Sequence, residues 1–288
     1  MVKNMISENN KQKIVFMIIR VAAFFSVAVL ILVFIFVFMG GAEVININYL
    51  TKMWSHSDIR QGGIFPAILG SVFLGIGVAM ASIPIGIGAA IYLNEYAKDN
   101  LFTRSIKLAI RNLAGIPSII YGLFGLSFFV LFLRLGTSLA AASLTLGVMT
   151  LPWIITASEE ALKAVPLSLR EGSYALGASK WQTIQGNVLP HSWSGILTGS
   201  ILGISRAMGE TAPIIVVGAT FFMSYLPTSP FDKFMALPYH TFILATQHSS
   251  QYAQEYALGT ALVLICLTFI LNLGVFIIRY KLRKKKEW

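Results

Sequence analysis

The chain has 288 residues, of which 56% are hydrophobic and 12% are charged, and its formal net charge is +10. Soluble domains carry about 25% charged residues, roughly twice this share. The composition therefore excludes a disordered chain, a disulfide scaffold and an ordinary soluble enzyme, and it predicts a polytopic helical membrane protein. The single cysteine, Cys266, lies in an apolar run and is expected to be a lipid-facing or packing residue.

Six apolar segments follow one another along the chain, and most reach the ~20 residues that cross a hydrocarbon core. We predict transmembrane helices over residues 21–39, 64–93, 112–133, 137–157, 195–222 and 256–278. The first is too long for the apolar region of a signal peptide, so we expect it to be retained. The second is overlong and contains Pro84, which indicates either one kinked helix or a helix with an extension at the membrane edge.

The basic residues lie at the borders of these segments, as in proteins whose orientation is set by charge. If the N-terminus is cytoplasmic, 17 of the 22 Lys and Arg residues fall inside, four fall outside, and Arg206 lies within a segment. We therefore predict that both termini are cytoplasmic. The positive charge is explained by topology, so we expect membrane lipid and no nucleic acid as a partner.

The domain organisation is predicted to be simple because no long polar linker interrupts the chain. Residues 1–60 would hold the N-terminal tail, the first transmembrane helix and the first external loop. Residues 61–280 would form the core with five transmembrane helices, and residues 281–288 a basic cytoplasmic tail.

The cytoplasmic loop of residues 158–194 is too long for a simple connector and is patterned. Pro166 can begin a short helix, Gly177 can supply a turn at its end, and apolar residues then recur at helical spacing. The pattern predicts a helix–turn–helix with a corner of small residues at 175–179. It is either a docking surface for a partner or an amphipathic segment without one.

The fifth apolar segment contains Arg206 and Glu210 near its middle. A charge at that depth costs about 2.5–3.5 kcal/mol on insertion scales, so it should face a cavity or a partner. Their i, i+4 spacing would put both on one helix face, with the hydroxyls of Ser205 and Thr211 nearby. We interpret the four residues as part of a translocation path, and a structural ion pair is the alternative.

The third apolar segment contains Gly115, Pro117 and Gly122, which favour bending and close packing. The simpler interpretation is that these residues allow close helix packing. The alternative is that a bend here serves as a gate.

The loop carries a family resemblance. Permeases of binding-protein-dependent ABC importers have a loop motif of Glu-Ala-Ala, three residues, Gly, nine residues, Ile, any residue and Leu-Pro. This chain resembles the motif at Glu171, Gly177 and Leu189-Pro190, with Gly172, Ser173 and Asn187 as departures. The resemblance implies the type I importer permease fold and a coupling role. The residues that would dock on an ATPase are Glu171, Ala175, Leu176, Gly177 and Ala178, with Leu189 and Pro190 ending the motif.

Further blocks resemble the PstA-type permease subunit of phosphate-specific importers, including NLAGIPSIIYGLFG (112–125) and SRAMGETAPII (205–215). The resemblance implies inorganic phosphate as substrate and location in a bacterial or archaeal cytoplasmic (inner) membrane. The implied partners are a sister permease, two copies of an ABC ATPase and an extracytoplasmic phosphate-binding protein.

The chain itself is not expected to be an enzyme. It has no Gly-x-x-x-x-Gly-Lys-Ser/Thr phosphate loop, so ATP would be hydrolysed by the separate subunit. We expect no catalytic residue, cofactor or metal. The alternatives are a permease for another oxyanion, an intramembrane enzyme acting on a lipid phosphate, and a passive channel. The four histidines lie outside the apolar segments, which disfavours the enzyme, and a channel does not explain the shaped loop.

Overall fold

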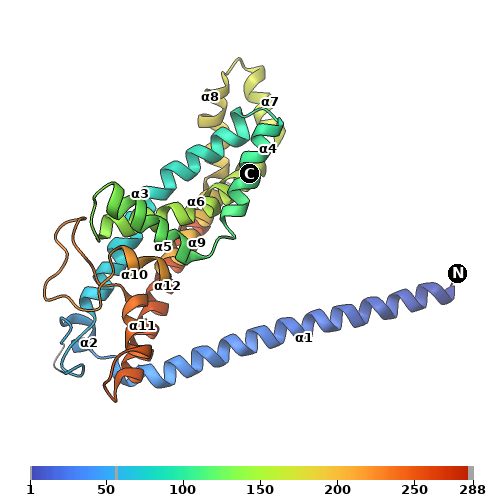
Figure 1. Cartoon of the computed structure of the whole chain (residues 1–288). Helices are drawn as coiled ribbons and strands as arrows, with labels where there is room; N and C mark the ends of the chain where they lie inside the picture. The colour runs from blue at the N-terminus through green and yellow to red at the C-terminus, as the bar shows by residue number, and fades with distance from the viewer. Residues whose placement is uncertain (1, 56–57, 285–288) are drawn as a thin grey trace.

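The computed structural model describes residues 2–55 and 58–284, and helices make up most of these two ranges (Figure 1). The α-helices are α1 (Val2–Gly41), α2 (Ile47–Thr51), α3 (Phe65–Ile91), α4 (Leu101–Leu113), α5 (Ser118–Gly125), α6 (Leu139–Lys163), α7 (Leu167–Ala175), α8 (Lys180–Thr183), α9 (Leu189–Met208), α10 (Ala212–Val217), α11 (Leu237–Thr246) and α12 (Ala253–Lys284). Four short segments complete them: the 3-10 helix η1 (Ala42–Val44) and the π-helices η2 (Tyr92–Tyr96), η3 (Leu126–Phe132) and η4 (Ile184–Val188).

Four helices of the described chain are long and apolar enough to cross a membrane: Gln12–Val44, Phe65–Tyr96, Leu139–Lys163 and Ala253–Lys281. A fifth crossing is present if the bent pair Leu101–Leu113 and Ser118–Phe132 is one span. The helical membrane fold is confirmed, whereas the count of six is not.

The second predicted segment is one helix rather than two pieces. Residues Phe65–Tyr96 are helical throughout, with Pro84 inside α3 and the π-helix η2 at the end. A π-helix has one more residue per hydrogen-bonded turn than an α-helix and occurs mostly as a short local widening. The long segment thus extends past the apolar region into the loop side of the molecule.

The fifth predicted segment is not a continuous helix, and the prediction was wrong here. Helix α9 ends at Met208, Gly209 is its C-terminal cap, and a short α10 begins at Ala212 with Pro213 in its first turn. Proline lacks the amide hydrogen needed inside a helix but fits a first turn, so this sequence favours a break before it.

The third predicted segment is also broken. Helices α4 and α5 meet at 101° across residues 114–117, because Pro117 stands at the N-cap of α5. A residue before proline is pushed out of the helical conformation, which ends α4 near Leu113. The predicted bend is therefore confirmed, but as a sharp turn that leaves α4 on the loop side.

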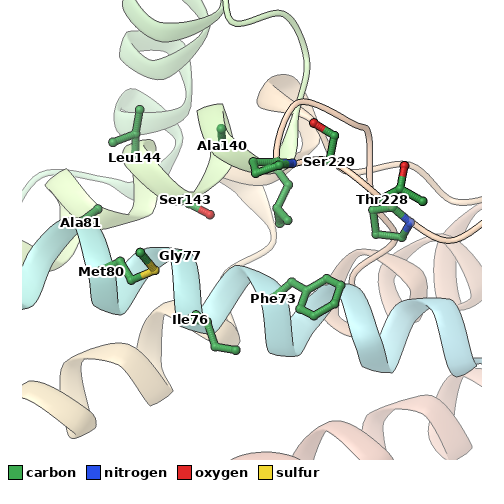
Figure 2. Close-up of a pocket in the computed structure, with 13 residues that line it drawn as sticks. Phe73, Ile76, Gly77, Met80, Ala81, Ala140, Ser143, Leu144, Thr228 and Ser229 are labelled. Carbon is green, nitrogen blue, oxygen red and sulfur yellow. The ribbon is translucent and has the colours of Figure 1, made fainter.

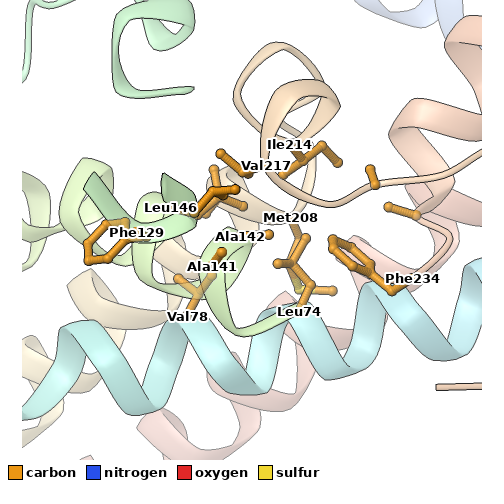
Figure 3. Close-up of a cluster of buried hydrophobic side chains, with 14 of the residues drawn as sticks. Leu74, Val78, Phe129, Ala141, Ala142, Leu146, Met208, Ile214, Val217 and Phe234 are labelled. Carbon is orange, nitrogen blue, oxygen red and sulfur yellow. The ribbon is translucent and has the colours of Figure 1, made fainter. Parts of the chain in front are cut away.

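The interior consists of three apolar clusters along the length of the molecule. The central one joins α3, α6, α9, α10 and the α5–η3 segment, and Figure 3 shows Leu74, Val78, Leu146 and Met208 pointing into it. A second lies around α2, α11 and the start of α12, and a third around η2, η4 and the end of α6. Where lipid surrounds the helices, close van der Waals packing of such side chains holds them together, since lipid is as apolar as the side chains themselves.

The two ends of the molecule differ in what they carry. Helices α2 and α11 lie at one end, and α4, α7 and α8 lie at the other, where α12 also ends (Figure 1). The loop helices and the end of α12 thus share one end of the molecule (Figure 1). Which side of the membrane this end faces stays a prediction, and the tail residues 285–288 lie outside the described residues.

Helix α1 extends away from this body (Figure 1). None of the most apolar window within Gln12–Val44 is buried, although Phe24, Phe25 and Leu30 are large apolar side chains. Only its last turn meets the body, where Gly41 lies directly against the backbone of Leu258 in α12. This surface must be covered by lipid or by another protein.

Candidate functional site

Arg206 lies in the last turn of α9 and lines a cavity of about 240 Å³. Its guanidinium carbon lies 4.6 Å from the ring centroid of Trp153 on α6, which is cation–π geometry. Thr150 and Tyr121 also line the cavity. Arg206 thus lines a cavity, as expected for a charge within an apolar segment, and its side chain is exposed there.

Glu210 lines the same cavity, but the predicted pairing with Arg206 is wrong. Helix α9 ends at Met208, so the two side chains are not one helical turn apart. Among the ion pairs of the described residues, none joins Arg206 to Glu210. The guanidinium rests on an aromatic face instead, so its charge is not neutralised by a bonded carboxylate.

Ser205 and Thr211 lie away from this cavity. The Ser205 hydroxyl donates to the Asn272 side-chain oxygen on α12 at 2.9 Å, on the other side of α9. Thr211 is the N-cap residue of α10, and its carbonyl accepts from the Ile215 amide at 3.3 Å. The structure therefore brings together Arg206 and Glu210 and separates the two hydroxyls from them.

The break between α4 and α5 forms the wall of the cavity opposite Arg206. Residues 113–118, which include Gly115 and Pro117, all line it. The Tyr121 hydroxyl donates to the Leu113 carbonyl at 2.8 Å and so bridges the break. Gly122 has a different role, because a Cβ there would lie 2.8 Å from the Pro213 Cα, which identifies it as a packing residue.

A second cavity of about 620 Å³ lies between α3, α6 and residues 227–230 (Figure 2). Figure 2 shows Phe73, Ile76, Met80 and Leu144 around it, and no charged residue belongs to its lining. An oxyanion needs charged or strongly polar partners when it leaves water. The smaller cavity at Arg206 is therefore the candidate substrate site.

The loop of residues 158–194 is a helical elbow, as predicted. Helices α7 and α8 are joined by a turn in which Gly177 has φ +81°, a left-handed conformation that favours glycine. The Ser173 and Thr183 hydroxyls meet at 2.9 Å and fix α7 to α8. We call α7, the turn and α8 the elbow.

The elbow exposes the residues predicted to dock. Leu176 at its tip is 90% exposed, and Glu171, Ala175 and Gly177 are exposed beside it. Ala178 is half-buried. Their exposure leaves these residues accessible to a partner, and the docking role stays a prediction.

Leu189 and Pro190, the end of the loop motif, lie inside a continuous helical stretch. Segments α8, η4 and α9 follow one another without a break. Pro190 is accommodated in the first turn of α9, where its missing amide hydrogen costs little. The elbow is thus continuous with α9, and Arg206 lies at the far end of that helix.

Buried charges that the sequence did not reveal lie where the elbow meets the body. Arg170 of α7 pairs with Glu95 of η2 at 3.1 Å and donates to the Leu162 carbonyl at 2.8 Å. Glu159 of α6 pairs with Lys107 of α4 at 2.6 Å. No spacing rule predicts the two ion pairs, because each joins segments that are distant in sequence.

The fold and the exposed elbow define a class of membrane protein. The chain belongs to the family of binding-protein-dependent transport system inner membrane components, whose model matches residues 82–287. Members of this family are membrane-spanning permeases of ABC importers, which work with an ATPase, a substrate-binding protein and a second permease. The family thus places this chain in the inner membrane and excludes the enzyme interpretation.

Named relatives narrow the class. The chain is 33% identical over 290 residues to the probable ABC transporter permease protein YqgH of Bacillus subtilis, covering 94% of this chain and 90% of that one. It is 32% identical to the phosphate transport system permease protein PstA 1 of Mycobacterium tuberculosis, covering 81% and 77%. Its fold is similar to a chain of the MetNI methionine ABC transporter in an inward-facing conformation, with TM-score 0.62, 16% identity and coverage of 76% and 95%.

Proposed function

We propose that this chain is a permease subunit through which an ATP-driven importer moves inorganic phosphate across the cytoplasmic membrane. The observation that carries the proposal is Arg206, a permanently charged group that lines a cavity and forms no ion pair with any carboxylate among the described residues. The similarity of the chain to proteins named phosphate permeases supports phosphate over other anions as the substrate.

Arg206 suits the chemistry of passage. A phosphate ion must leave water to cross a low-dielectric layer, and a guanidinium can offer two parallel hydrogen bonds to its oxygens. Conduction also needs weak binding, because a tightly held ion does not leave. Glu210 on the same cavity wall supplies a negative charge that keeps the affinity low, although it does not pair with Arg206.

The energy would come from outside the chain. Two copies of an ATPase would hold the elbow of this subunit and that of a sister permease, and an extracytoplasmic protein would deliver phosphate. Closure of the ATPase pair on ATP would push the elbow, and rigid helices would switch the cavity between outward and inward access. The α4–α5 break at Gly115 and Pro117 is the part of the wall best placed to act as a gate.

The proposed topology has six crossings with both termini in the cytoplasm. In it α9 is the fifth crossing in chain order and brings the count to six. Helices α6, α12 and α3 contact it, which fits its more polar composition. Residues 1–60, which include the uncovered helix α1, would form the surface that meets the sister permease. Residues 61–280 would form the core.

The test is uptake of labelled phosphate into vesicles that contain the chain with its partner subunits. We expect ATP-dependent uptake that unlabelled phosphate inhibits far better than sulfate or molybdate. We expect Arg206→Gln to abolish uptake while the subunits still co-purify. Arg134→Gln is the matched control, since Arg134 is an exposed arginine outside the cavity.

Two results would contradict the proposal. Normal phosphate uptake by Arg206→Gln would remove the role of Arg206. Inhibition by sulfate or molybdate as strong as that by phosphate would favour the other candidate, a permease for another oxyanion.

A further inference from the structure

The elbow is fastened to the body by a buried charge contact. Arg170 and Glu95 have side chains that are 15% and 6% exposed, and they meet at 3.1 Å. The Glu95 carboxylate also accepts a hydrogen bond from the Asn94 side chain at 2.8 Å. Charge pairs with so little solvent around them hold a fixed geometry, unlike pairs at the surface.

Arg170 reaches two spans from one side chain. The same guanidinium nitrogen that contacts Glu95 donates to the carbonyl of Leu162, near the end of α6. A cation at a helix C-terminus satisfies carbonyls that have no partner inside the helix. Arg170 thus joins α7 to the ends of both α3, through η2, and α6.

A second contact joins the elbow to η2 from α8. The Lys180 ammonium lies 5.1 Å from the ring centroid of Tyr96, the residue after Glu95. Helices α7 and α8 of the elbow therefore contact neighbouring residues of the same π-helix, η2. Short π-helices are frequent at functional sites, where they depart locally from α-helical geometry.

We infer that Arg170 is a positioning residue that transmits motion of the elbow to α3 and α6 through its contact with Glu95. The inference rests on the proposed function, because it assumes that a partner pushes the elbow. Without this contact the elbow would still dock, and α9 would still be continuous with α8. The elbow could then tilt against η2 without moving α3.

The chain offers a matched control at the same end of the molecule. Arg104 of α4 pairs with Asp99 at 2.8 Å, but these side chains are 69% and 75% exposed. Surface pairs of this kind contribute little. Arg104→Gln therefore removes the same kind of charge pair without cutting a buried connection.

The experiment measures phosphate taken up per ATP hydrolysed by the complete complex in vesicles. We expect Arg170→Gln to retain the ATPase on co-purification and to lower this ratio by about tenfold, within the usual range of coupling between sites. Arg104→Gln should leave it unchanged. Glu95→Gln should lower it similarly, and the Arg170→Gln/Glu95→Gln double variant should be no worse than either single variant.

A second readout does not depend on the transported ion. A cysteine replacing the exposed Met80 of α3, in a chain with Cys266→Ser, should change its labelling rate when ATP is added. Arg170→Gln should abolish that change. If Arg170→Gln folds poorly, Glu95→Gln can be tested by the same labelling measurement.

The outcomes separate the two proposals. A wild-type complex that takes up no phosphate contradicts the proposed substrate. The labelling experiment still tests whether the Arg170–Glu95 contact transmits motion to α3. A wild-type ratio and ATP-dependent labelling in both Arg170→Gln and Glu95→Gln, or additive losses in the double variant, would overturn the inference.

Discussion

Gly177 closes α7 in a left-handed conformation, with φ +81°, that other residues adopt at a cost of about 1–2 kcal/mol. A Cβ at this position would meet no atom within 4 Å, so the requirement is conformational and not one of space. The glycine of the loop motif is thus explained by the turn that orients the two arms of the elbow.

Gly177→Ala should therefore distort the elbow and lower the stimulation of ATP hydrolysis by the permease. Gly177→Asn should be milder, because asparagine tolerates the left-handed region better than alanine does. Gly172→Ala is the control, since Gly172 lies inside α7 with open space around it. This substitution should raise the stability of the folded protein by about 0.5–1 kcal/mol. Equal stimulation by the wild type and Gly177→Ala would refute this explanation.

The two helix breaks are the elements that build the cavity. Gly122 of α5 lies against the backbone of Pro213 in α10, whereas Gly115 in the break would meet only the Asn112 carbonyl, at 3.4 Å from a Cβ. The sequence left packing and gating open for both. The structure identifies Gly122 as a packing residue and places Gly115 on the cavity wall.

Gly122→Val should push α10 away from α5 and lower the stability of the purified protein by about 1–3 kcal/mol, the usual cost of overpacking. We expect a lower thermal unfolding midpoint. Gly115→Ala should keep the midpoint and change the rate of uptake if the break is a gate. A wild-type midpoint for Gly122→Val would show that the contact is not tight.

The helices opposite the elbow enclose a histidine. His240 of α11, outside the candidate spans, is fully buried, with its ring stacked on Phe221 at 4.8 Å and edge-on to Trp54 at 4.5 Å. Burial disfavours its charged form and lowers its pKa to about 3. His248 contacts the same two aromatic rings, and His56 lies outside the described residues.

This burial makes stability depend on pH in a definite direction. The unfolded chain binds a proton near pH 6.5 and the folded chain only near 3, so stability is lost as pH falls between these values. The limiting slope is about 1.4 kcal/mol per pH unit. His240→Phe should flatten the fall in unfolding midpoint from pH 6.5 to 4.5. The same fall in both proteins would contradict the assignment.

For the molecule as a whole, apolar runs predicted the long helices well. The segments 64–93, 137–157 and 256–278 each correspond to one continuous helical segment, and the first two begin only one or two residues before theirs. A helix that crosses lipid requires a local, uninterrupted apolar sequence, which can be recognised without knowing the fold. The elbow was also predictable, since Gly177 and the helical spacing around it are local signals.

Contacts between distant segments could not be predicted from the sequence. Arg206 was assigned to Glu210 by spacing, yet the chain turns at Gly209 and the arginine meets Trp153. Ser205 faces Asn272 for the same reason: helix packing decides which neighbour a side chain meets. Such side-chain partners depend on the whole fold and cannot be inferred from residue spacing in the sequence.

The account depends most directly on a separate ATPase holding the elbow. The measurement is disulfide cross-linking of the assembled complex, with a cysteine in place of the highly exposed Leu176 and single cysteines scanned over the groove of the ATPase. We expect a cross-link that stops ATP-driven uptake until it is reduced, whereas a cysteine replacing Tyr225, near the opposite end, gives none. Absence of any cross-link from Leu176 and its neighbours on the elbow, in a complex that transports, would contradict the account.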